Sequence, residues 1–227
     1  MTLRDLIEPL VRPINGQRPR PWFTHYHDPA SARVFLVGAN QASAYKEDAV
    51  SHEQHVDALF NQNGLNCEKL YRQLGFKSRS RPYLDRFCQE LGARGIHDVL
   101  QTNVICYSTK NAAKLSNAEH SAGRSRGAEI FRALVSHVKP RVMVVHGSGT
   151  AKMLRKTFRV EFEGPPSNTG PATDRIYASR LSIDGGPMEI IAMPTLAMSG
   201  VTRWVSWQPR YFALVADHIV SALEAKD

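Results

Sequence analysis

The stretch that decides the fold is RVFLVGANQAS, residues 33–43. Its apolar run, residues 34–37, is typical of a strand buried on both faces of a parallel sheet. Gly38 then permits a tight turn and a close approach of the backbone. Asn40 and Gln41 follow at the carboxyl end of this strand, where doubly wound sheets bind their ligands. The stretch therefore predicts an α/β fold with a site at one edge of the sheet.

Three later segments repeat this change from an apolar run to a polar loop. They are DVLQTNVICYST (98–109), RVMVVHGSGTA (141–151) and MEIIAMPTLAMSG (188–200). We expect the four loops to converge on one site. The predicted fold is a three-layer α/β/α sandwich around a central, mainly parallel four-stranded sheet, formed by residues 1–227 as a single domain.

The spacing of apolar residues predicts helices over residues 2–11, 48–74, 84–91, 128–138, 150–156 and 209–224. The second of these is expected to break near Asn63. Residues 175–183 and 188–193 are expected to form a hairpin that leads into the last core strand. Residues 15–23 are expected to be an irregular basic connection, and residues 111–127 a polar, mobile segment.

The composition suits a globular protein, with 42% hydrophobic and 22% charged residues. The chain has no apolar run of about 18 residues and its N-terminus lacks the apolar region of a signal peptide, so we expect a cytoplasmic protein that contacts no membrane. Its three cysteines are scattered and form no CxxC pair, so we expect neither a disulfide framework nor a metal site. The formal net charge of +8 favours a nucleic-acid partner.

Two basic or glycine-rich segments remain open to more than one interpretation. KSRSRPY, residues 77–83, is either a solvated loop or a loop that contacts phosphates. HGSGTAK, residues 146–152, could bind phosphate at a helix N-terminus, but it is neither GxGxxG nor a Walker A sequence. It is also not a GxSxG elbow, because His146 and Thr150 occupy the glycine positions. A tight turn that needs glycine for packing is the favoured interpretation.

GANQAS, QTNVICYST and MPTLAMSG occur together in the order and at roughly the spacing of motifs in the uracil-DNA glycosylase superfamily, which the chain resembles over about residues 33–223. NCEKLYRQL, residues 66–74, is similar to the helix after that family's first motif. The motifs are closest to those of the mismatch-specific thymine/uracil branch. The chain could also resemble phage-defence glycosylases that attack modified cytosine. The resemblance implies a uracil-DNA glycosylase-like fold and a base-excising hydrolase that needs no cofactor.

The resemblance implies roles for two asparagines. Asn40 holds the position that faces the attacking water, and an amide there would orient the water rather than act as a base. Asn40 could instead be a turn-forming residue that tolerates unusual backbone angles. Asn103 matches the family's base-reading asparagine, whose amide offers an acceptor and two donors to a pyrimidine. Its alternative role is to satisfy the backbone at the strand end.

Four further residues are candidates for contact with the base. Gln41 replaces the family's usual proline and could add a polar contact. Ala42 replaces the tyrosine that excludes a 5-methyl group, so the position leaves room for a 5-substituted pyrimidine. Tyr45 or Phe60 could stack on the flipped base.

MPTLAMSG resembles the loop that wedges into the minor groove. Met193 stands where the fastest family members have histidine, and the thymine branch also carries methionine there. Since methionine cannot donate a hydrogen bond to the base, stabilisation of the departing base must come from backbone N–H groups or another side chain. The residues expected to contact DNA are Met193, Pro194, Thr195, Leu196, Met198, Ser199, Arg203 and Trp204. Trp204 could instead anchor the final helix.

The sequence therefore predicts a monomeric, monofunctional DNA glycosylase of repair or phage defence. It would flip out a uracil or a 5-modified pyrimidine, such as glucosylated hydroxymethylcytosine, and hydrolyse its N-glycosidic bond. The alternative is a non-catalytic DNA-binding module on the same fold, in which Met193 and Gln41 mark lost chemistry. A third hypothesis is a nucleotide-binding enzyme built on HGSGTAK.

Overall fold

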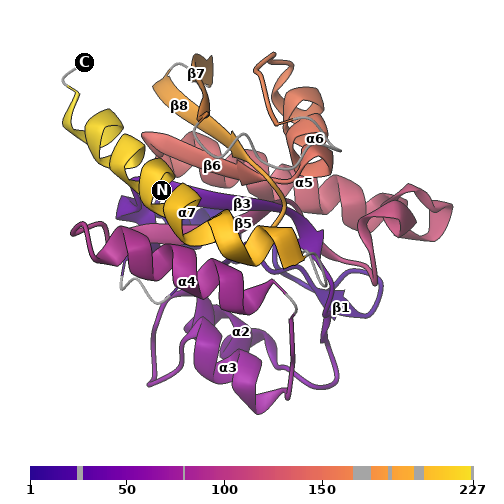
Figure 1. The fold of residues 1–227 in the computed structure, drawn as a ribbon. Coiled ribbons are helices and arrows are strands. Elements are labelled where there is room, and N and C mark those ends of the chain that lie inside the picture. Colours follow the sequence, from indigo (N-terminus) through magenta and orange to yellow (C-terminus); the bar gives the residue numbers. More distant parts are fainter. Residues whose placement is uncertain (25–27, 79, 166–174, 184–185, 197–201, 226–227) are drawn as a thin grey trace.

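The structure is a computed structural model that describes residues 1–24, 28–78, 80–165, 175–183, 186–196 and 202–225, with side chains omitted for 202–207. Its main sheet has six strands in the order β2-β5-β3-β6-β8-β7 (Figure 1). Their bounds are β2 (Trp22–Phe23), β5 (Val99–Ser108), β3 (Val34–Gln41), β6 (Val142–His146), β8 (Gly186–Met193) and β7 (Tyr177–Ile183). The four central strands are parallel, and β2 and β7 run antiparallel at the edges. The chain is therefore an α/β protein with a mixed, mostly parallel sheet.

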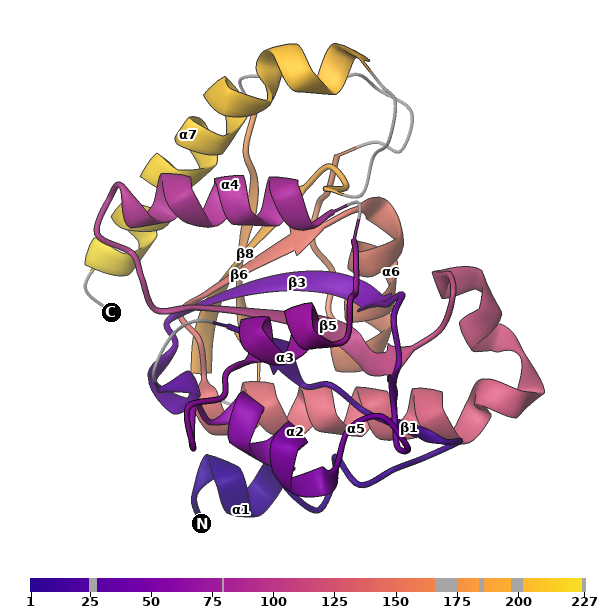
Figure 2. The ribbon, with the colours of Figure 1, turned by 90° about the horizontal axis from the view of Figure 1, so that it is seen from below.

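Helices cover both faces of this sheet. The longer helices are α2 (His52–Leu59), α4 (Arg81–Gly92), α5 (Ser121–Val138), α6 (Ser148–Phe158) and α7 (Thr202–Glu224). The shorter ones are α1 (Leu3–Ile7), η1 (Pro29–Ser31), α3 (Cys67–Gln73), η2 (Ala112–Ser116) and η3 (Ala118–His120). Figure 2 shows α4 and α7 on one side of the strands and α5 on the other. In the described part of the chain, no helix is both long and apolar enough to cross a membrane.

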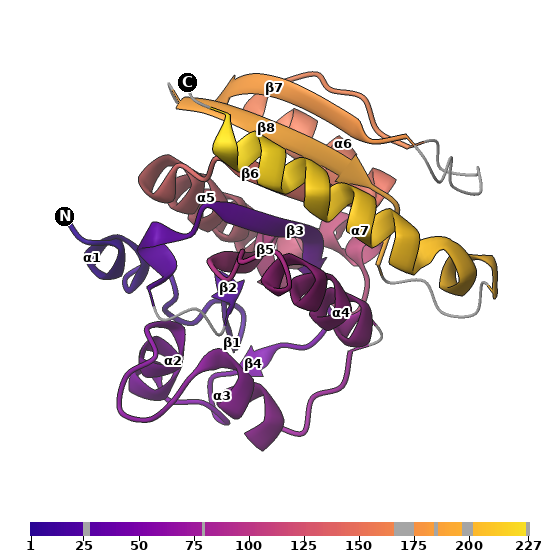
Figure 3. The same cartoon turned by 60° about the vertical axis from the view of Figure 1, so that its left-hand side comes forward.

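The side chains of the central strands alternate between two cores. Val34 and Leu36 face the core formed with α4 and α7, which contains Phe87 and Phe212. Phe35, one residue along β3, belongs to the core on the other side, under α5 and α6. Figure 3 shows α4 and α7 lying across the front of the strands. The apolar run of residues 34–37 is thus buried on both faces, as predicted.

The predicted four-stranded sheet corresponds to the central parallel strands, but the sheet continues on both sides. Residues 15–23, expected to be irregular, contribute β2 at one edge and β1 (Gln17–Arg18), which pairs with β4 (Tyr45–Lys46) in a separate small sheet. Two-residue strands have no detectable alternation in sequence, so they escape pattern analysis. The predicted hairpin is confirmed: β7 pairs antiparallel with β8, while its turn lies outside the described residues.

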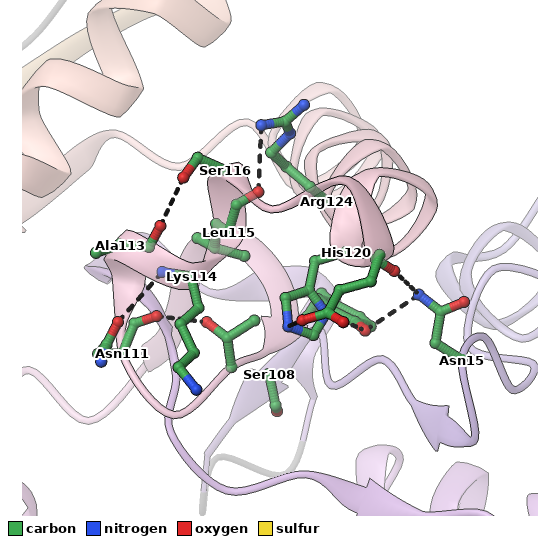
Figure 4. Close-up of polar contacts among 12 residues, drawn as sticks. Asn15, Ser108, Asn111, Ala113, Lys114, Leu115, Ser116, His120 and Arg124 are labelled. Carbon is green, nitrogen blue, oxygen red and sulfur yellow. Dashed lines mark hydrogen bonds and ion pairs between the residues drawn. The ribbon is translucent and has the colours of Figure 1, made fainter.

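Residues 111–127, which were expected to be a polar, mobile segment, are largely helical. The segment contains η2, η3 and the first two turns of α5. Figure 4 shows its polar contacts: the Asn111 side chain accepts from the Lys114 backbone N–H, and Arg124 donates to the Leu115 carbonyl. Asn15 donates to the Glu119 carbonyl at 3.1 Å. Caps and side-chain bonds therefore order a segment that has few apolar residues.

The helix boundaries follow the predicted order with shifts at several ends. The break near Asn63 is confirmed, since Asn63 and Gly64 both have positive φ between α2 and α3. The last helix begins at residue 202 rather than 209, so Pro209 lies inside it. Proline lacks a backbone donor and is uncommon inside helices, so the start of this helix is not apparent from the sequence.

Candidate functional site at the strand ends

The polar ends of the parallel strands meet in one row across the sheet. Gly38 on β3 pairs in register with Asn103 on β5, and His146 on β6 pairs with Met193 on β8. Gly38 lies one residue beyond the pairing of Val37 with Val145, which places it beside His146. We call Asn103, Gly38, His146 and Met193 the strand-end row. The ends of the four central strands therefore lie side by side at these positions, but Gly38, which was expected at a tight turn, lies within β3.

Two polar side chains close over Gly38 in this row. A Cβ atom added at Gly38 would lie 2.7 Å from Oδ1 of Asn103 and 3.1 Å from Nε2 of His146. Both side chains are half-buried. The amide can donate and accept, and a neutral imidazole has one donor and one acceptor. These side chains occupy the space that a side chain at position 38 would take, and both carry groups able to bind the polar edge of a planar ligand.

His146 is the residue that the sequence analysis treated only as part of a glycine-rich turn. Burial lowers the pKa of His146 to about 4, so its imidazole is neutral at pH 7. Its Nδ1 is buried and has no hydrogen-bond partner among the described residues. Its position could have identified it as a candidate, because it is the last residue of a strand whose loop was expected to reach the site. Gly147, which follows, has a φ of +91° and its N–H bonds the Met193 carbonyl at 2.9 Å.

Asn40 is held by its amide nitrogen. Nδ2 donates to Oγ1 of Thr109 at 2.8 Å and to the Gln41 carbonyl at 3.1 Å. The Thr109 hydroxyl in turn donates to the Asn111 carbonyl at 2.7 Å, so its oxygen is an acceptor toward Asn40. This network fixes which end of the amide is nitrogen. The carbonyl oxygen Oδ1 of the half-buried Asn40 is left as the end that can accept a hydrogen bond from a water.

The two residues after Asn40 differ in burial. Gln41 is buried, and its Nε2 donates to the Arg20 carbonyl at 2.7 Å, so its side chain ties the strand end to the N-terminal segment. Ala42 is exposed. The suggested polar contact from Gln41 to a base therefore has no support in this arrangement, while Ala42 remains open to solvent.

Tyr45 and Phe60 are packed away from the strand-end row. Tyr45 is 2% exposed, and its ring contacts Phe76 and His55. Phe60 packs edge-to-face against Trp22 at a centroid distance of 5.5 Å. The Tyr45 ring is therefore buried and the Phe60 ring is partly buried against the core, so stacking on a flipped base would require both rings to leave these contacts.

The loop after β8 is only partly described. The side chains of Met193 and Leu196 are 1% and 0% exposed and belong to the core with α4 and α7. A wedge must be exposed to enter DNA, so the expectation for Leu196 is wrong in this structure. Pro194 and Thr195 are half-buried, and Thr195 lies beside Gly147. Outside the described residues or side chains lie Met198, Ser199, Arg203 and Trp204.

The described residues contain no cluster of three His, Cys, Asp or Glu side chains that could hold a metal ion. No protein-family model matches the chain, and no curated protein matches it in sequence. The fold and the site together define an α/β protein with a six-stranded, mostly parallel sheet and a polar row at the carboxyl ends of its central strands.

Proposed function

We propose that the protein is a monofunctional DNA glycosylase with a three-layer, uracil-DNA glycosylase-like fold. It would flip a pyrimidine out of DNA and hydrolyse its N-glycosidic bond, leaving an abasic site. The observation that carries the proposal is the approach of Asn103 and His146 over Gly38, with Asn40 two residues further along β3. The resemblance of the three motifs to the superfamily supports the same conclusion.

In the proposed mechanism, the flipped base lies beside the side chains of Asn103 and His146, which close over Gly38. Asn103 would read the base through its amide. His146, neutral because of burial, would donate a hydrogen bond to the base carbonyl on which negative charge develops as the bond to the sugar breaks. It would thereby supply the donor that Met193 cannot. A neutral donor suits this role because no proton has to be transferred to the base.

Asn40 would orient the attacking water through Oδ1, since its Nδ2 is bonded to Thr109. An amide is too weak a base to deprotonate water, so the bond to the base would have to be largely broken before attack. This dissociative order removes the need for the paired carboxylates of most glycosidases. The substrate class is uracil or a 5-modified pyrimidine, which the exposed, small Ala42 permits.

The test is a panel of labelled duplex and single-stranded oligonucleotides with uracil, mismatched thymine, hydroxymethylcytosine or its glucosylated form. Each is treated with protein and then with hot alkali, which cleaves abasic sites. We expect cleavage at one base, abolished by Asn40→Ala with DNA binding retained. His146→Ala should lower turnover about 100-fold, as loss of an oxyanion donor does. Equal turnover by Asn40→Ala would remove Asn40 from the mechanism.

A second proposal, a DNA-binding module without catalysis, is favoured by one observation. Met193 is buried in the core, so the position that carries the fastest relatives' histidine offers no donor. This alternative predicts tight, salt-sensitive binding to DNA and no cleavage of any oligonucleotide in the panel.

A further inference from the structure

The small β1–β4 sheet and α2 enclose a group of buried basic side chains. Arg18 and Arg20 are 7% and 8% exposed, and His55 is 1% exposed. We call Arg18, Arg20 and His55 the basic cluster. Arginine is rarely buried in proteins unless a counter-charge pairs with it. The cluster therefore needs an explanation that the proposed glycosylase reaction does not provide.

The three side chains gather around the ring of Tyr45. Arg18 is the cross-strand partner of Tyr45 in the β1–β4 ladder, and its Nε donates to the Val50 carbonyl at 2.6 Å. The Arg20 guanidinium lies 4.7 Å from the centroid of the Tyr45 ring. The His55 ring lies edge-on to the same ring at 5.5 Å. Arg20 and His55 thus contact the same aromatic ring, and the charges of both arginines act on His55.

Much of the donor capacity of the cluster is unused. Nη1 of Arg18, Nη1 of Arg20 and both ring nitrogens of His55 are buried without a hydrogen-bond partner. Among the ion pairs of the described residues, none joins either arginine to a carboxylate. Two carboxylates approach from outside: Glu8 lies 3.7 Å from Nε2 of His52, and the exposed Glu47 acts on Arg18. Burying donors and charges without partners costs free energy. An anionic acceptor placed among these side chains would remove that cost.

We propose that the basic cluster binds a small oxyanion, with the chemistry of inorganic phosphate or a phosphate monoester. Two guanidinium groups and an imidazole N–H match the oxygens of such an ion in charge and donor number. The ion would be small, because the unpartnered nitrogens have almost no exposed surface and a DNA strand could not reach them. Entry would require the two-residue β1–β4 ladder to open, which costs little for so short a ladder.

The first experiment measures the melting temperature of the full chain in potassium phosphate and in potassium chloride of matched ionic strength and pH. A ligand that binds only the folded state raises this temperature by mass action. At about 100 times the dissociation constant, we expect a rise of roughly 5–10 °C for a chain of this size. Broadening of the ³¹P signal of phosphate on addition of protein should accompany it. No phosphate-specific rise in the wild type would overturn the proposal.

Variants locate the effect. Arg18→Gln should abolish the phosphate response, and Arg72→Gln, which removes a charge from a side chain that is 76% exposed, should keep it. If Arg18→Gln fails to fold, His55→Glu provides a second test of the proposal. It would place a carboxylate beside both guanidinium groups, so the response should disappear while the melting temperature without phosphate does not fall. An undiminished response in His55→Glu would contradict the proposal.

A DNA arm separates the two sources of phosphate. A 20-nucleotide strand without any modified base replaces inorganic phosphate in the same assay. A response to DNA alone that Arg18→Gln abolishes would show that the ligand is a phosphodiester, and the small-ion proposal would be wrong. Because no step depends on base excision, the result stands apart from the outcome of the glycosylase assay.

Discussion

Asn103 and His146 approach the same point from opposite sides of β3. Oδ1 of Asn103 lies 2.7 Å, and Nε2 of His146 3.1 Å, from the position of the Cβ that Gly38 lacks. Because Gly38 pairs with Asn103 and adjoins His146 in the sheet, the distance between these polar groups is set by backbone hydrogen bonds rather than by mobile loops. Sites built on strands in this way are held more firmly than sites on loops.

The first prediction concerns Gly38→Ala. The added methyl group would collide with the Asn103 amide and displace it together with His146. The displaced atoms are ends of side chains, so the free energy of unfolding should fall by only about 1–2 kcal/mol. Base excision should nevertheless fall at least 100-fold. Oligonucleotide cleavage and urea unfolding, measured on the same sample, check both expectations.

Gly92→Ala is the matched control for this substitution. Its added Cβ would meet the His97 ring at 3.5 Å, an ordinary van der Waals contact. Gly92 ends α4 and lies outside the strand-end row, so excision by Gly92→Ala should equal that of the wild type. If Gly38→Ala also retained full activity, the close approach of Asn103 and His146 at Gly38 would have no part in the site.

The second prediction concerns Thr109, which positions Asn40 without contacting the substrate. Thr109→Val keeps the shape of the side chain but removes the oxygen that accepts from Nδ2 of Asn40. The Asn40 amide could then rotate, and we expect kcat to fall about 10-fold with little change in KM. Thr109→Ser retains the hydroxyl and should restore most of kcat. A loss of stability without a change in kcat would assign Thr109 a purely structural role.

The sequence was sufficient to predict the central parallel strands and their polar ends, because apolar runs and the polar residues that follow them are visible in the residue order. It could not show which side chains turn inward after the strand ends. Met193 and Leu196 occupy positions where the resemblance implies DNA contact, yet both are buried under α4 and α7. His146 was missed because its role depends on a neighbouring strand, β3, more than 100 residues earlier in the chain.

The third prediction concerns acid stability and His55. Burial, and then the charges of Arg20, Arg18 and His52, lower the pKa of His55 to about 3. The unfolded chain takes up this proton near pH 6.5 and the folded chain only near pH 3. Keeping His55 neutral in the folded chain therefore costs no stability above pH 6.5. As the pH falls from 6.5 toward 3, protonation of His55 favours the unfolded chain, and the free energy of unfolding decreases. The full loss is at most about 5 kcal/mol.

His55→Gln should remove this part of the pH dependence. Urea unfolding in phosphate-free buffers gives the free energy of unfolding of each protein between pH 3 and pH 7. The slope of this free energy against pH should be smaller for His55→Gln than for the wild type. His97→Gln serves as the control, because His97 is exposed and its replacement should leave the wild-type slope unchanged. Identical slopes for His55→Gln and the wild type would show that His55 is protonated without unfolding.

The last prediction concerns the contact of α5 with β5, which hydrophobic periodicity did not reveal because it is made through glycine. A Cβ on Gly127 would lie 2.9 Å from the Cys106 backbone nitrogen and 3.0 Å from Cγ2 of Ile105. Backbone cannot move aside as a side chain can, so Gly127→Ala should cost about 3 kcal/mol from overpacking. The helix propensity of alanine offsets about 1 kcal/mol of this cost. A net loss of about 2 kcal/mol should lower the melting temperature by roughly 4–8 °C.

Gly149→Ala provides the comparison, since an added Cβ there meets no atom within 4 Å and α6 gains the same propensity. Its melting temperature should equal or exceed that of the wild type. Because β5 carries Asn103 and leads to Thr109, a shift of α5 away from β5 should also slow base excision in Gly127→Ala. A Gly127→Ala protein as stable as Gly149→Ala would mean that α5 packs less closely on β5 than these distances require.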